Sequence, residues 1–135
     1  MHNEVNMSQR IECVNAPTLI APKGHYSHCV TANGLVFISG QLPVDKLGNA
    51  VIDVSFQKQA SLVLDNLQAC LDAVNCSKAQ LVQVRVYIAD MENWPLFNQI
   101  YANWMGDHRP ARAVAGVAEL HFGAALEIEA VAVSA

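Results

Sequence analysis

Several features that mark common protein classes are missing from this chain. No apolar run approaches the ~20 residues that a membrane-spanning helix needs, and the first nine residues are polar, without the hydrophobic core of a signal peptide. Lys and Arg never cluster, and the net charge is −4. Phosphate backbones are bound mainly through basic clusters. These absences argue against a membrane protein, an exported protein and a nucleic-acid binder, so we expect a cytoplasmic chain.

The four cysteines, Cys13, Cys29, Cys70 and Cys76, lack the spacing of a metal site or redox motif. They form no Cys-x-x-Cys pair, and no His-x-x-x-His set accompanies them. In a chain without an export signal, free thiols in a reducing cytosol are the expected state. The sequence also has no phosphate loop and no dinucleotide fingerprint. We therefore predict neither a metal nor a cofactor.

The composition is that of a folded domain. Hydrophobic residues make up 53% of the 135 residues and charged residues 15%, which is enough apolar material for one core. No repeat, linker or low-complexity block interrupts the chain. We predict a flexible amino-terminal tail over residues 1–9 and a single domain over residues 10–135. The apolar share is high for a lone small domain, which suggests that subunit contacts cover part of it.

Strands are predicted from short runs that alternate or are apolar throughout. Asn33-Gly34 predicts a tight hairpin turn, because this pair supplies the positive φ values that such turns require. The apolar residues of the segment 82–88, which are Val82, Val84, Val86 and Ile88, alternate strictly with Gln83, Arg85 and Tyr87. This two-residue period indicates a strand with one buried face. The predicted strands are residues 10–14, 29–31, 35–41, 82–88, 113–120 and 126–133, with a further extension at 51–52.

Two helices are predicted between these strands. Ser55 can cap a helix over residues 56–74 whose apolar positions recur every three or four residues. A second helix begins near Asn93, tolerates Pro95 in its first turn and runs to Met105. The resulting order, β-β-β-α-β-α-β-β, predicts an α+β layer with both helices on one face of the sheet. The other apolar face would then be covered by a second subunit, so we expect a homo-oligomer.

The carboxyl-terminal third carries the strongest candidate site residues. Arg112 stands between Pro110 and a strand of small residues, where its planar guanidinium can reach a small ligand and bind a carboxylate through two parallel hydrogen bonds. A surface arginine in an ordinary ion pair is the competing interpretation. Glu127 and Glu129 share one face of their strand with two valines. A partly buried glutamate there can have a raised pKa and act as general acid or base, and a simple rim carboxylate remains the alternative.

The segment before the second strand supplies weaker candidates. His25 and His28 are only two possible ligands, whereas catalytic zinc normally has three protein ligands, so we predict no metal there. Tyr26 is placed to stack on a small planar ligand or to bond to it. Ser39 and Gly40 end a buried strand, where glycine allows a ligand to reach the backbone.

Taken together, these segments resemble the RidA/YjgF family of enamine/imine deaminases. The resemblance runs in the family's order and covers nearly the whole chain from about Val14 to the end. The matching segments are Ala21–Ser27, Val36–Pro43, Phe97–Tyr101, Arg109–Ala113 and Glu127–Val133.

The resemblance implies a chorismate-mutase-like fold with a mixed sheet, assembled as a homotrimer with sites between subunits. It implies hydrolysis of 2-aminoacrylate and related 2-enamine or 2-imine acids to 2-keto acids and ammonia, as metabolite damage control without a cofactor. Arg112 corresponds to the family's carboxylate-binding arginine, and Glu127 to the carboxylate that positions water. Tyr26, Ser39 and Gly40 correspond to residues that line the pocket.

The chain also departs from the family pattern. His25 replaces a common proline, Ala113-Val114 follow the arginine in place of Ser-Cys, and Leu120-His121 lacks the usual Leu-Pro. Two alternatives to the simple deaminase therefore stay open. One is a specialised catabolic deaminase for aminomuconate-like imines, with His25 or His121 altering the pocket. The other is a trimer that binds small ligands or protects proteins as a holdase without catalysis.

Overall fold

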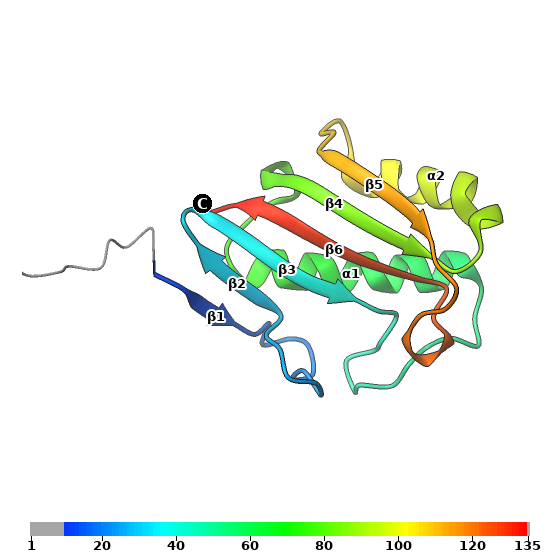
Figure 1. Ribbon diagram of the computed structural model, residues 1–135, viewed down its shortest axis with the longest axis horizontal. Helices are drawn as coiled ribbons and strands as arrows, with labels where there is room; N and C mark the ends of the chain where they lie inside the picture. Colours follow the sequence, from blue (N-terminus) through cyan, green and yellow to red (C-terminus); the bar gives the residue numbers. More distant parts are fainter. Residues whose placement is uncertain (1–9, 135) are drawn as a thin grey trace, which may run out of the picture.

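Six strands form one mixed sheet in the order β1-β2-β3-β6-β4-β5 (Figure 1). The structure is a computed structural model and describes residues 10–134, so the predicted tail over residues 1–9 lies outside the described residues. β4 and β5 pair in parallel, and every other neighbouring pair is antiparallel. The strands are β1 (Glu12–Val14), β2 (Cys29–Ala32), β3 (Leu35–Gln41), β4 (Leu81–Ile88), β5 (Ala111–Gly116) and β6 (Leu126–Val133).

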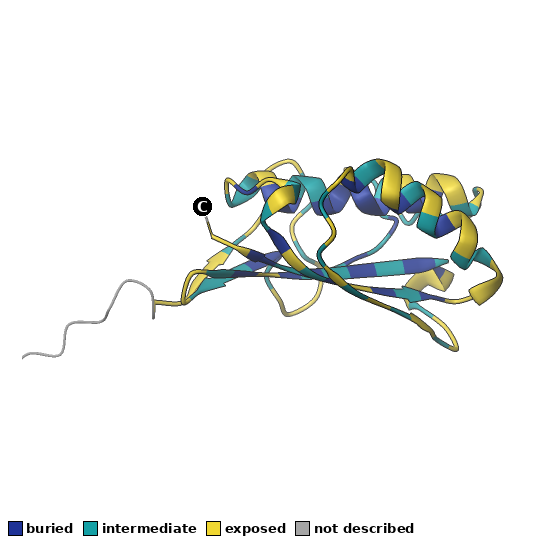
Figure 2. Cartoon of the chain, turned by 90° about the horizontal axis from the view of Figure 1, so that it is seen from above, coloured by how far each residue is buried: buried dark blue, intermediate teal, exposed yellow. Residues whose placement is uncertain are grey.

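Both long helices, α1 (Phe56–Ala73) and α2 (Trp94–Met105), cover the same face of this sheet (Figure 2). Ser55 caps α1 as predicted, because its hydroxyl accepts a hydrogen bond from the N–H of Lys58. Over the described range, neither helix combines the length and the apolarity that crossing a bilayer requires. Three short 3₁₀ turns complete the fold: η2 (Lys78–Gln80), η3 (Met91–Asn93) and η4 (His121–Gly123). The α+β class, the element order and the placement of both helices on one face are confirmed.

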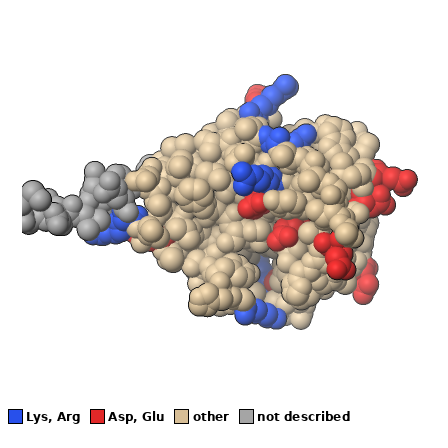
Figure 3. Space-filling model, in the orientation of Figure 1, with Lys and Arg blue, Asp and Glu red and all other residues tan. Residues whose placement is uncertain are grey.

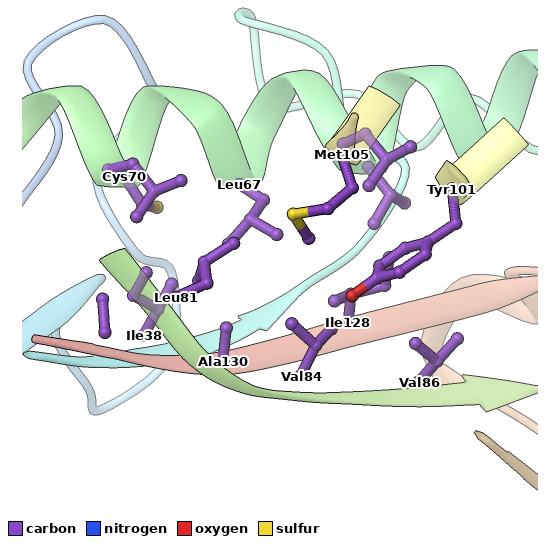
Figure 4. Close-up of a cluster of buried hydrophobic side chains, with 14 of the residues drawn as sticks. Ile38, Leu67, Cys70, Leu81, Val84, Val86, Tyr101, Met105, Ile128 and Ala130 are labelled. Carbon is purple, nitrogen blue, oxygen red and sulfur yellow. The ribbon is translucent and has the colours of Figure 1, made fainter. Parts of the chain in front are cut away.

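The core lies between the helices and the sheet (Figure 4). Alternate residues of β4 and β6 point into it, because successive side chains of a strand face opposite sides. α1 supplies Leu64, Leu67 and Leu71 to the same core, at the three- and four-residue spacing of one helix face. The buried hydrophobic residues of the strands are Cys29, Val36, Ile38, Leu81, Val84, Val86, Ile88, Leu126, Ile128, Ala130 and Ala132.

The opposite face of the sheet is not covered by any described element of the chain. Phe37, on the central strand β3, is 44% exposed, and Val131 stands opposite it on β6. Between them and the neighbouring strand β4 lies a hollow of about 190 Å³, bordered also by Arg85 and Glu129. Figure 3 shows that most of this face is uncharged, that acidic and basic groups lie beside each other near its middle, and that further acidic groups lie toward the right of the view. An apolar sheet face of this kind is normally buried against something.

Three predicted boundaries were wrong for physical reasons. Val82 is 40% exposed because an irregularity between Leu81 and Gln83 shifts the register, so Leu81 takes the buried position. β5 begins at Ala111 and ends at Gly116, where its parallel partner β4 also ends, so the predicted strand over residues 113–120 was too late and too long. Residues 51–52 form no strand: the nearest pairing is an isolated bridge between Val44 and Ala50 that closes a loop.

His28 fastens the amino-terminal loop to the sheet. Its ring Nδ1 accepts a hydrogen bond from the N–H of Ala16 at 2.9 Å, and the ring also bonds to the backbone of Ile20. The backbone N–H of His28 donates to Asn15 Oδ1 at 3.0 Å. Burial lowers the pKa of His28, and the bond to Ile20 opposes this only in part. The neutral ring is therefore the form that the fold requires.

We expect this buried ring to make the protein less stable in acid. The unfolded chain binds a proton on His28 near its ordinary pKa of 6.5, whereas the folded chain resists it. The contribution is therefore complete above that value and is lost as the pH falls toward the lower pKa of the folded state. Urea unfolding at about pH 7.5 and about pH 5 should show a smaller fall in the free energy of unfolding for His28→Asn than for the wild type. His25→Asn, at an exposed histidine, should retain the wild-type difference. An equal fall in His28→Asn and wild type would contradict this assignment.

Candidate active site

Glu127 lies on the uncovered face of the sheet, near the start of β6 and beside the end of β3. The pairing of β3 with β6 is irregular between Ile38 and Gln41, and this irregularity brings Gly40 against the Glu127 carboxylate. A Cβ atom on Gly40 would overlap the Glu127 carboxylate, so any larger residue here would force the Glu127 side chain to move. Irregular strand pairing of this type is common beside active sites, where it redirects a side chain or opens the backbone to a ligand.

The surroundings of Glu127 make its proton easier to retain. Burial raises the pKa of Glu127, the neighbouring Glu129 raises it further, and the nearby His121 lowers it. A carboxyl group whose pKa lies above its ordinary range can both accept and donate a proton nearer to neutral pH. Glu127 thus has the property expected of a general acid or base.

Glu129 shares this face, but its carboxylate has a different environment. The hydroxyl of Tyr87 donates a short hydrogen bond to Glu129 Oε1, and Arg85 stands opposite Glu129 in the strand register. The same hydrogen bond raises the pKa of Tyr87. The carboxylate of Glu129 is therefore hydrogen-bonded to a side chain of the neighbouring strand, whereas the carboxylate of Glu127 lies against Gly40.

A cavity of about 290 Å³ opens beside Gly40. It lies between the loop that carries Tyr26, the loop that follows β3, and η4, which contributes His121 and Phe122. Tyr26 is 54% exposed at this cavity. The structure therefore brings Tyr26 and Gly40 to one cavity, with Glu127 against Gly40.

Ser39 contributes to this region indirectly. Its hydroxyl donates to the carbonyl of Ser27 at 2.6 Å, and its N–H donates to the carbonyl of His28. These two bonds hold the Tyr26 loop against β3. Ser39 does not itself line the cavity, so the structure favours a role in positioning the loop.

Arg112 lies on the other face of the sheet. It pairs with the buried Val84 in the register of β4 and β5, and its side chain turns toward α2. Its Nη1 donates to Asn98 Oδ1 at 2.9 Å, and its guanidinium lies 5.0 Å from the centre of the Tyr101 ring and 5.9 Å from that of Trp94. An amide and two aromatic rings thus hold the guanidinium in one orientation.

Arg112 and Glu127 are consequently not brought together within one chain. The two predicted catalytic residues stand on opposite faces of one sheet, with Arg112 on the edge strand β5 and Glu127 on β6. A site that uses both groups needs Arg112 from one chain and Glu127 from another.

Two features of the region escaped the sequence reasoning. Asn98 lay in a matching segment but gave no sign of its bond to Arg112, which depends on the packing of α2 against β5. Phe122 has φ 64° and ψ 3°, a left-handed conformation that bulky residues rarely adopt and that costs about 1–3 kcal/mol. No local sequence signal indicates such strain.

The histidines of the Tyr26 loop do not converge on a common point. His28 is buried in the hydrogen bonds described above, and His25 is exposed. Among residues 10–134, no group of three or more His, Cys, Asp or Glu side chains is arranged to hold a metal ion.

Comparison with known proteins gives consistent matches. The family model described as Endoribonuclease L-PSP matches residues 16–134. Protein HMF1 of Saccharomyces cerevisiae is 37% identical over 120 residues, which cover 89% of this chain and 90% of HMF1. The 2-iminobutanoate/2-iminopropanoate deaminase of Mus musculus is 34% identical over 123 residues, which cover 91% of this chain and 89% of the deaminase.

A solved structure agrees with these matches. The crystal structure of E. coli TdcF with bound serine superposes with a TM-score of 0.84 at 30% identity, and the match covers 92% of this chain and 99% of TdcF. A family model that spans nearly the whole domain, relatives above 30% identity and a shared fold agree with one another. The chain belongs to the Endoribonuclease L-PSP family, the RidA/YjgF family.

Proposed function

We propose that this protein is a hydrolase of 2-enamine and 2-imine acids, which it converts to 2-keto acids and ammonia. The observation that carries the proposal is a partly buried carboxyl group, Glu127, with a raised pKa, held against a glycine beside a cavity. The deaminase name of the mouse relative supports the same reaction class. The reaction needs only water as co-substrate and fits a role in removing reactive metabolites.

The chemistry assigns one task to each residue. An enamine acid first tautomerises to the imine, and the guanidinium of Arg112 binds the carboxylate of that imine through paired hydrogen bonds. The imine reacts in its protonated iminium form, and the Glu127 carboxylate accepts a proton from water as the water oxygen bonds to the iminium carbon and the C=N π electrons move to nitrogen. The resulting carbinolamine has both a hydroxyl and an amino group on that carbon. Glu127 then returns its proton to the amine nitrogen, the C–N bond breaks with its electron pair leaving on ammonia, and the hydroxyl proton passes to the Glu127 carboxylate, and from it to ammonia or solvent, as the keto acid forms.

The proposed assembly is a homotrimer with each site between two chains. Arg112 and Glu127 of one chain face opposite ways, so a neighbouring chain has to supply one of them. Arg112 lies on the edge strand, from which it can reach a neighbour. The uncovered face around Phe37 and Val131 supplies the apolar surface that a neighbour would bury.

The charge distribution of this chain gives less support to the ribonuclease activity that the family description names. Nucleic-acid backbones require a surface of clustered positive charge. Here the net charge is −4, and the uncovered face carries acidic and basic groups side by side (Figure 3). We place the imine chemistry in a reducing compartment such as the cytosol, because Cys29 and Cys70 are free cysteines in the core, where the thiol of Cys29 donates to the backbone carbonyl of Cys70.

Substitution of the two proposed catalytic residues should affect different steps. A serine dehydratase can generate 2-aminoacrylate while keto acid release is followed in the presence of semicarbazide, which competes for the imine. Arg112→Ala should lower kcat/KM about 10- to 100-fold, since hydrogen bonds to a charged group contribute about 1.5–3 kcal/mol. Glu127→Gln should lower kcat about 10²–10⁴-fold and still bind keto acid.

A wild type no faster than buffer on all imines, with keto acid binding intact, would favour a non-catalytic binding role. Protection of unfolded proteins that neither substitution changes would favour a holdase.

The proposed assembly predicts the effect of a charge on the uncovered face. Phe37→Asp should change the light-scattering mass from about three times 14.6 kDa to that of one chain, and activity should be lost with it. A carboxylate at this position would have to be desolvated in the interface. Leu96→Asp, at an exposed position of α2 in the helix layer, should leave the mass and the activity unchanged. A Phe37→Asp protein that keeps the wild-type mass would exclude this face as the interface.

Asn98 should act as a positioning residue for Arg112. Asn98→Ala removes the acceptor at 2.9 Å and should raise KM about 2- to 10-fold, since one hydrogen bond contributes about 0.5–1.5 kcal/mol, with little change in kcat. Gln99→Ala, at the next and exposed position of α2, is the matched control and should behave as wild type. A fall in kcat without a change in KM would contradict a role in carboxylate binding.

A further inference from the structure

The cavity beside Gly40 is larger than a small imine requires. Its volume is about 290 Å³, whereas an apolar cavity of about 150 Å³ already accepts benzene. An imine derived from serine or alanine would place only a methylene or methyl group there. The cavity therefore has room for a branched or aromatic side chain.

Apart from Tyr26 and His121, the polar side chains that line the cavity form hydrogen bonds with the chain's own backbone. Asn66 on α1 illustrates this, because its Nδ2 donates to the carbonyls of Leu42 and Val44 at 3.0 and 2.9 Å. Four further lining side chains are engaged in the same way: Lys23 with the carbonyl of Gly48, His28 with the N–H of Ala16, Gln41 with the carbonyl of Ser39, and Asp45 with the N–H groups of Leu47 and Asn49.

The rest of the lining is mainly apolar. These residues come from both loops that flank the cavity and from η4, and together they offer a ligand contact area without hydrogen bonds. They are Leu19, Ile20, Ala21, Pro22, Leu42, Val44 and Phe122. A cavity with engaged polar groups and apolar walls favours an apolar occupant, because a polar group placed there would lose its bonds to water.

Phe122 is held at this cavity in an unfavourable conformation. Its backbone has φ 64°, the residue is 43% exposed, and the centroid of its ring lies 3.8 Å from that of the His121 ring. Asparagine and glycine tolerate this conformation better than phenylalanine. A large aromatic side chain kept in a strained and exposed position is explained most simply by a function for the ring.

The position of Phe122 connects the cavity to the proposed reaction centre. Gly40 borders the cavity and contacts the Glu127 carboxylate, and His121 lies close enough to Glu127 to lower its pKa. Because Gly40 lies against Glu127 and also lines the cavity, an imine carbon bound at Glu127 would lie next to the cavity that Phe122 helps to line. We infer that the cavity is a side-chain subsite and that Phe122 selects 2-imino acids with branched or aromatic side chains. This inference rests on the proposed function.

The test compares imines that differ only in their side chains. An L-amino acid oxidase generates imines from alanine, leucine and phenylalanine, and semicarbazide traps what the protein has not hydrolysed. The wild type should have a kcat/KM at least tenfold higher for the leucine or phenylalanine imine than for the alanine imine. Phe122→Asn should reduce that ratio about tenfold and at the same time raise the melting temperature, because asparagine relieves the backbone strain.

Two further variants distinguish an effect of cavity size from a general effect of substitution in these loops. Ala21→Phe fills the cavity from an exposed loop position and should reduce the same ratio. Leu47→Asn replaces an exposed apolar residue of the neighbouring loop that does not line the cavity and should leave the ratio unchanged. A wild type without preference among the imines, or a Phe122→Asn protein with an unchanged ratio, would overturn the inference while leaving the deaminase proposal intact.

A binding measurement separates this inference from the proposed function. Calorimetry with Glu127→Gln should show tighter binding of 4-methyl-2-oxopentanoate than of pyruvate, and Phe122→Asn in the same background should remove the difference. If no imine is hydrolysed by the wild type but this binding difference is present, the deaminase proposal fails and the subsite is retained. Equal binding of the two keto acids would overturn the subsite.

Discussion

The covering of only one face of the sheet is the constraint on which the rest of this structure depends. Because α1 and α2 both pack on the same side, alternate residues of β6 face two different environments. Leu126, Ile128 and Ala130 enter the core (Figure 4 labels the last two), while Glu127 and Glu129 take the intervening positions, which face the uncovered side. Glu127 can therefore be next to core residues in the sequence while its carboxyl group, whose pKa is raised by burial, lies on the opposite face of the sheet.

The same constraint separates the two groups that the proposed reaction needs. Arg112 faces the helix side, where Asn98 and two aromatic rings orient its guanidinium, and Glu127 faces the open side. No rotamer change would bring them together through a sheet. Assembly would join Arg112 of one chain to Glu127 of the next and bury the apolar surface around Phe37. The same contact between chains would then stabilise the oligomer and complete the site.

Sequence patterns predicted those parts of the fold that local chemistry determines. Asn33-Gly34 marked the hairpin, where both residues have positive φ, and the alternation in Leu126–Val133 gave the bounds of β6 and the shared face of its two glutamates. Features that depend on a partner strand were mispredicted: Val82 is displaced by an irregular pairing, and β5 ends where β4 ends. The strand pattern could not distinguish Glu127 from Glu129, and only the family resemblance favoured Glu127, because the hydroxyl of Tyr87, which engages Glu129, comes from another strand.

Phe122 shows why substrate choice was harder to predict than reaction class. The groups that define the reaction, a guanidinium and a carboxyl group, are recognisable as residue types. In the proposed subsite, selectivity instead depends on which lining groups remain able to bind a ligand. Asn66, Gln41 and Asp45 look polar in the sequence, yet their hydrogen bonds to the backbone leave an apolar interior. The strain at Phe122 is likewise a property of η4 in three dimensions. A cavity that appears polar by composition can therefore select an apolar side chain.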